Sequence, residues 1–105
     1  MNIAANYLKH RNMIVQHRNG NPKGAFFIEE GVEQLAEMSY SIAGPDIMII
    51  DHTEVEDKLR GKGAGIKMLL SLTEYARKNN YKIVPLCPFA KSVFDKREDL
   101  RDILK

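Results

Sequence analysis

The sequence has a single cysteine, no long apolar run and almost no excess of charge, and each shortage narrows what the chain can be. With only Cys87, no disulfide can form within the chain, which fits a reducing compartment. No apolar run approaches the roughly 20 residues that a membrane helix needs. Residues 1–12 carry no secretory signal pattern. We therefore expect a cytoplasmic protein with no membrane partner.

The charged residues are numerous but balanced in sign. Lys and Arg number 16 and Asp and Glu 14, which gives a formal net charge of +2. Nucleic-acid-binding surfaces usually gather basic residues on one face with aromatic residues between them, whereas here the two signs are interleaved. No cluster of His, Cys, Asp or Glu has the spacing of a metal site. We expect neither a nucleic-acid partner nor a metal.

The length and the hydrophobic pattern predict one α/β domain over residues 1–105, with one modest core. Four strands separated by Gly, Pro and Asn turns predict an antiparallel meander. A strand–helix–strand unit follows, whose two strands should be parallel. The fourth strand begins with a continuous apolar run, which predicts cover on both faces. The expected strands are 13–18, 24–30, 36–42, 47–55 and 81–86; the expected helices are 63–78 and 89–95, with further helical turns over 98–104.

The most informative stretch is the glycine-rich turn at 60–65, RGKGAG, which lies between an apolar strand and an amphipathic helix. Unpaired backbone N–H groups at such a helix N-terminus form a site for an anion, most often a phosphate. The spacing fails the Walker A pattern and the dinucleotide-binding GxGxxG pattern. A flexible turn without a ligand is the plainer alternative.

Three motifs together carry a resemblance to a known family. The turn at 60–65 resembles the R-x-x-G-x-G/A signature of the GCN5-related N-acetyltransferases, and the element order is similar to that family's core. DHTEV at 51–55, LRGKGAG at 59–65 and LCPF at 86–89 are similar to a subfamily of very small GCN5-like proteins. The resemblance implies a minimal GCN5-like fold in which the fourth and fifth strands splay apart, followed by short C-terminal helices.

The resemblance also implies acetyl-CoA as the donor substrate. The pantetheine arm would pair with the backbone of the fourth strand, and the pyrophosphate would meet the amides of the turn, where glycines avoid Cβ clashes. The positive charges of the turn would face phosphate, although plain solvated charge is the alternative. The expected donor-binding residues are Thr53, Glu54, Val55, Arg60, Gly61, Lys62, Gly63, Ala64 and Gly65.

The acceptor side of the family is largely missing. Typical members have two helices between the first two strands, where this chain has only Asn19 to Lys23. There is also no room after Phe89 for the usual final hairpin. The acceptor amine is therefore unidentified, and we expect a monomer or a weak dimer.

Three residues are candidates for the chemistry. Cys87 ends the fifth strand just before Pro88, where a helix N-terminus would favour a thiolate, and the small subfamily carries a proposed active-site cysteine in this CPF context. Its alternative role is that of a small buried apolar residue. His52 and Glu54 share one face of the fourth strand by parity, opposite Asp51 and Thr53, and are candidate bases. Structural and surface roles remain open for both.

Three functions follow. The first is an N-acetyltransferase that moves acetyl from acetyl-CoA to an amine, through an acetyl-cysteine at Cys87 or without one. The second is an acetyl-CoA-binding module with little or no transferase activity. The third, a nucleotide- or nucleic-acid-binding protein, is the weakest because the basic residues do not cluster. The remaining histidines, His10 and His17, are expected to lie on the surface.

Overall fold

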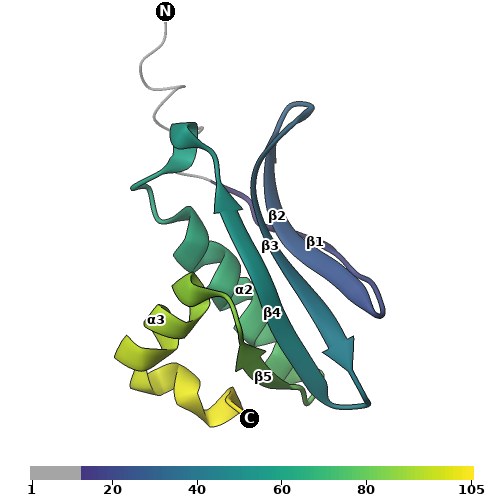
Figure 1. Ribbon diagram of the computed structural model, residues 1–105. Helices are drawn as coiled ribbons and strands as arrows, with labels where there is room; N and C mark the ends of the chain where they lie inside the picture. The colour runs from purple at the N-terminus through teal and green to yellow at the C-terminus, as the bar shows by residue number, and fades with distance from the viewer. Residues whose placement is uncertain (1–12) are drawn as a thin grey trace, which may run out of the picture.

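Five strands pair in chain order into one mixed sheet in the computed structural model, which describes residues 13–105 (Figure 1). Consecutive strands among the first four are antiparallel, and the fifth strand is parallel to the fourth. The expected meander and the strand–helix–strand unit are thus confirmed. The strands are β1 (Gln16–Arg18), β2 (Lys23–Glu30), β3 (Glu33–Ala43), β4 (Ile47–Val55) and β5 (Lys82–Pro85).

One long helix covers one face of the sheet. Helix α2 (Ala64–Lys78) lies behind the sheet in Figure 1, with Leu69 fully buried on its inner side and Leu70, the next residue, 38% exposed. This is the geometry that an apolar stripe at helical spacing produces. The other helical elements are η1 (Asp57–Leu59), α3 (Pro88–Lys96) and η2 (Glu98–Ile103).

The core lies on the α2 side of the sheet. Met48 and Ile50 of β4 are completely buried there, together with Met38 and Tyr40 of β3. The intervening residues of β4 are only half-buried. The expectation that the apolar start of β4 is covered on both faces is therefore confirmed in part: α2 buries one face completely, and the other face is half-buried.

The C-terminal segment is fastened to the edge strand β5. Leu104 forms a parallel bridge with Ile83, and the Lys105 amide donates to the Ile83 carbonyl at 3.0 Å. The Arg77 guanidinium of α2 donates two hydrogen bonds to the Asp102 carboxylate, at 2.7 and 3.1 Å, and lowers its pKa. The chain after α3 thus meets the sheet edge through a short parallel bridge.

The expected surface position of His17 is wrong, whereas His10 lies outside the described residues. The His17 ring is half-buried and stacks on Phe26, with 4.0 Å between ring centroids. Its Nε2 lies 2.7 Å from the Tyr40 hydroxyl oxygen. Alternation within so short a strand could not reveal that this residue faces the aromatic side chains of the core.

Burial lowers the pKa of His17 below its ordinary value of 6.5. The unfolded chain therefore binds this proton more readily than the folded chain, so stability contributed by neutral His17 falls as pH drops below 6.5 towards the folded-state value. We expect the loss of stability between about pH 7.5 and 5.5 to be smaller in His17→Gln than in the unaltered chain. Urea unfolding at both pH values measures this, and equal losses would contradict it.

Candidate functional site

Strand β5 pairs along its whole length with the first half of β4 only. The paired registers run from Ile47 with Lys82 to Ile50 with Pro85. The amides of Leu86 and Cys87 then both donate to the Ile50 carbonyl at 3.1 Å, after which the chain turns into α3. The remainder of β4, residues 51–55, has no strand partner on this side within residues 13–105. The two strands thus diverge, as expected, and leave a stretch of open backbone edge.

A β-bulge at Asp51 changes which side chains of β4 face the core. Ser39 pairs with His52, but the next residue of β3, Tyr40, pairs with Ile50, which leaves Asp51 as the extra residue. The Asp51 carboxylate accepts a hydrogen bond from the Ser41 hydroxyl on the polar face of the sheet. The expectation that Asp51 points away from the His52 face is therefore wrong, since an extra residue breaks simple alternation.

Beyond the bulge the parity of β4 is reversed. Before it, the even-numbered Met48 and Ile50 face the core; after it, Thr53 and Val55 lie on that side, paired with the buried Met38 and Ala36 of β3. His52 and Glu54 lie on the opposite, exposed face, as expected. The bulge thus turns Thr53 towards the gap between β4 and β5.

The turn after η1 presents a row of backbone N–H groups. Gly61 and Gly63 have φ of +75° and +82°, a region where other residues are strained. Gly63 caps α2 without any side-chain hydrogen bond, and α2 has no acidic residue in its first turn. The amides of residues 63–66 donate to no acceptor among residues 13–105. They form an empty donor cradle at a helix N-terminus, which suits an anion.

Two basic side chains flank the cradle. The Arg60 side chain is 72% exposed, with Nε 3.3 Å from the Val55 carbonyl oxygen and a terminal nitrogen 3.4 Å from the Asp57 carboxylate. No ion pair of Lys62 is found among residues 13–105. Arg60 is thus held at the end of β4.

The need for glycine at position 65 has a second structural cause, which the sequence did not predict. A Cβ atom there would lie 2.6 Å from the Phe89 ring. The missing side chain therefore makes room for Phe89 of α3, in addition to any ligand that reaches the turn. The sequence pattern could not show this contact, because Phe89 lies on a different helix.

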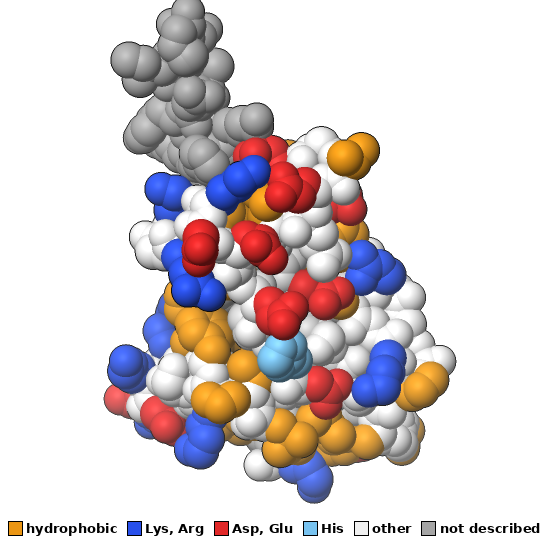
Figure 2. All heavy atoms as spheres, turned by 45° about the horizontal axis from the view of Figure 1, so that its top comes forward, with side chains coloured by type: hydrophobic (Ala, Val, Ile, Leu, Met, Phe, Trp, Pro, Cys, Tyr) orange, Lys and Arg blue, Asp and Glu red, His pale blue; other side chains and the backbone are white. Residues whose placement is uncertain are grey.

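Two adjoining cavities connect the cradle with the open edge of β4. The smaller, of about 220 Å³, runs from Thr53 past the glycine turn to Ile66. The larger, of about 660 Å³, is lined by His52, Glu54 and the following acidic residues. Thr53, Val55, Arg60 and Phe89 line both. We call the two together the cleft. Figure 2 shows a histidine side chain beside several acidic side chains on one exposed face of the molecule.

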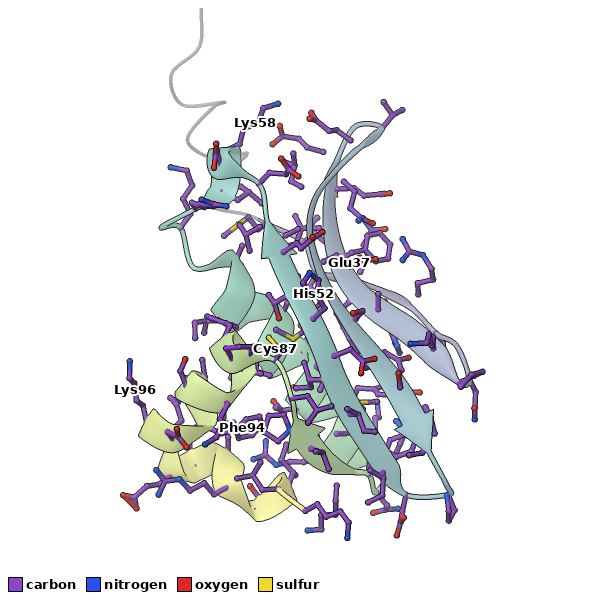
Figure 3. All side chains as sticks on the ribbon, viewed as in Figure 1. Glu37, His52, Lys58, Cys87, Phe94 and Lys96 are labelled. Carbon is purple, nitrogen blue, oxygen red and sulfur yellow. The ribbon has the colours of Figure 1, made fainter. Side chains whose placement is uncertain are left out.

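The Cys87 thiol does not line the cleft itself, because the Thr53 side chain lies between the two. Cys87 is 4% exposed and lines neither cavity, but Sγ lies 3.0 Å from the Thr53 hydroxyl oxygen. Figure 3 shows Cys87 between β4 and the start of α3. Pro88 occupies the first turn of that helix, with Cys87 as its N-cap, as expected. Thr53 is thus the side chain that joins the thiol to the cleft.

His52 and Glu54 form a pair on the exposed face. His52 Nε2 lies 3.2 Å from a carboxylate oxygen of Glu54, and both side chains are more than half exposed. A carboxylate at this distance orients the imidazole ring. Both residues line the larger cavity, whereas the thiol contacts Thr53 on the other side of β4.

Other kinds of site have little support in the described part of the chain. Residues 13–105 contain no group of three or more His, Cys, Asp or Glu side chains placed to hold a metal ion. None of the helices described is both long and apolar enough to cross a bilayer. Sequence reasoning did not single out Phe89, which lines both cavities, or four further lining residues: Glu56, Asp57, Leu59 and Ile66.

Comparison with known proteins agrees with this geometry. The model of the GCN5-related N-acetyl-transferase family matches residues 25–103. A GCN5-like, provisionally assigned N-acetyltransferase from Staphylococcus aureus, solved by NMR in solution, is 36% identical; the match covers 90% of this chain and 89% of that one, with a TM-score of 0.69. No curated protein gives a significant match. The chain belongs to the GCN5-related N-acetyltransferase family.

Proposed function

We propose that the chain binds acetyl-CoA in the cleft and transfers the acetyl group to an amine. One observation carries the proposal: the cradle of unpartnered N–H groups before α2 opens into the same cleft as the unpaired edge of β4. A ligand with a pyrophosphate at one end and an amide-bearing arm at the other satisfies both. Family membership supports the same donor substrate.

Each group of donor-binding residues would contact a different part of acetyl-CoA. The amides of residues 63–66 would hold the pyrophosphate, with charge neutralisation from Lys62 and Arg60. The backbone of residues 53–55 would pair with the pantetheine amides as an added strand. In this arrangement the thioester would lie near the point where β4 and β5 diverge, beside Thr53 and on the His52 side of the cleft.

In the transfer step, the amine nitrogen forms a bond to the acetyl carbon and the bond from that carbon to the CoA sulfur breaks. The amine must lose a proton, and the departing CoA thiolate takes one up. His52, oriented by Glu54, would accept the amine proton on the exposed side of β4. The acceptor would enter over this face, which no helix among residues 13–105 covers.

The donor-site part of the proposal is tested by titration. Acetyl-CoA and CoA should shift the amide NMR signals of residues 53–65, whereas ATP and RNA should leave them in place. The proposal fails if CoA leaves these signals unchanged. Turnover with a panel of amines then separates an enzyme from the second candidate, a binding module with little or no activity, which the short link between β1 and β2 favours.

If acetyl transfer runs through an acetyl-cysteine intermediate, we expect acetyl-CoA to acetylate Cys87. The thiolate forms a bond to the acetyl carbon, CoA leaves, and the exchange of one thioester for another is close to balanced in energy. Intact-mass spectrometry should show one added acetyl group, and Cys87→Ala should abolish it. No adduct on the unaltered chain, or an adduct that survives Cys87→Ala, would rule this route out and leave direct transfer to the amine.

A further inference from the structure

The Thr53 hydroxyl oxygen lies within hydrogen-bond distance of the Cys87 sulfur, at 3.0 Å. The β-bulge at Asp51 is the reason it does so, because the reversed parity turns Thr53 towards the gap where β4 and β5 part. Thr53 also lines both cavities of the cleft, whereas the thiol is 4% exposed. One hydroxyl group therefore links a buried sulfur to the cleft.

A hydroxyl group suits this position for a chemical reason. It both donates and accepts hydrogen bonds, so by rotating it can accept from the neutral S–H group and donate to the thiolate. A valine of the same shape would offer neither bond. Since the sulfur is almost completely removed from water, it has no solvent to replace a lost partner.

We propose, on the basis of the acetyl-CoA function above, that Thr53 is a positioning residue for Cys87. Its hydroxyl holds the sulfur at the wall of the cleft and stabilises the thiolate. During acetyl transfer the sulfur forms a bond to the acetyl carbon, the bond from that carbon to the CoA sulfur breaks, and CoA takes up the proton that the thiol released. The role belongs to the side chain and is separate from the backbone pairing of Thr53 with the donor substrate.

Two substitutions isolate the hydroxyl. Thr53→Val keeps the shape and removes the hydrogen bond, and Thr53→Ser keeps the hydroxyl and removes a methyl group. Because Cys87 is the only cysteine, alkylation by iodoacetamide, followed by intact mass, reports on this thiol alone. We expect Thr53→Val to react about tenfold more slowly near neutral pH, with its pH–rate profile displaced to higher pH, and Thr53→Ser to follow the unaltered chain.

This measurement needs no acetyl-CoA, so it is independent of the proposed function. Equal profiles for the unaltered chain and Thr53→Val would overturn the inference, as would a serine variant that behaves like the valine variant. A native chain that does not react, although the unfolded chain does, would also overturn it, because the thiol must be reachable from the cleft. If the profiles differ as expected and acetyl-CoA leaves no adduct, the thiol route fails and the positioning role stands.

A spectroscopic measurement on the unaltered chain covers the case in which Thr53→Val does not fold. The S–H stretching band in the Raman spectrum moves to lower wavenumber when the thiol donates a hydrogen bond. We expect the band of the folded chain, at a pH where the thiol is neutral, to lie below that of a simple alkanethiol in an apolar solvent, which has no hydrogen-bond acceptor. Coincident bands would show that the thiol donates no such bond and would overturn the inference.

Discussion

Gly63→Val is expected to weaken CoA binding by about tenfold to a hundredfold, the loss that follows when hydrogen bonds to a charged group are removed. Gly63 has a φ of +82° and stands at the N-cap of α2, where the cradle begins. No atom lies within 4 Å of the position of an added Cβ, so a side chain there meets open space where the pyrophosphate would approach. It would also strain the backbone that orients the cradle.

Gly44→Val is the matched control for this prediction. Gly44 also has a positive φ, +71°, and also has open space at its Cβ position, but it lies in the turn between β3 and β4, at the opposite end of β4 from the cleft. Both substitutions impose similar backbone strain, about 1–2 kcal/mol. Isothermal titration with CoA should therefore show a loss for Gly63→Val only. Equal losses would mean that strain, and not the cradle, governs binding.

Leu69→Ala is expected to lower the free energy of unfolding by about 2–5 kcal/mol. Leu69 is completely buried on the inner face of α2, within the core that α2 forms with the sheet. Truncation removes buried methyl groups and leaves a cavity that the surrounding strands can fill only in part. In a chain with one small core, such a loss is a large share of the total stability.

Leu70→Ala provides the comparison within the same helix. Leu70 is the next residue, with the same helix propensity change on substitution, but its side chain is 38% exposed. We expect a cost below about 1 kcal/mol. Urea unfolding monitored by circular dichroism measures both. Similar costs for the two variants would contradict the assignment of the inner face of α2.

The repeating elements of the fold were predictable because burial repeats with the period of each element. The bounds of β4 were predicted as they are observed, and α2 begins only one residue later than predicted, at Ala64. The family motifs led to the diverging strands and the glycine cradle. The bounds of strands and helices depend on neighbours in the sequence, so local pattern reveals them, whereas the divergence of β4 from β5 was implied only by the resemblance to the family.

The features that could not be predicted depend on contacts between distant segments. The extra residue at Asp51 is invisible in the alternation of β4 and appears only when the register with β3 is known. The burial of His17 depends on Phe26 and Tyr40, and the need for glycine at 65 depends on Phe89. The sequence nevertheless predicted correctly that His52 and Thr53 lie on opposite faces of β4, because regular alternation resumes after the bulge.

The unpaired edge of β4 has a thermodynamic consequence for the whole chain. Within residues 13–105 this side of residues 51–55 has no strand partner, and on the proposed function the donor substrate supplies one. A ligand that binds only the folded state adds about 2.7 kcal/mol of stability at a hundredfold excess over its dissociation constant. The resistance of the protein to unfolding and proteolysis would then rise and fall with the concentration of CoA around it.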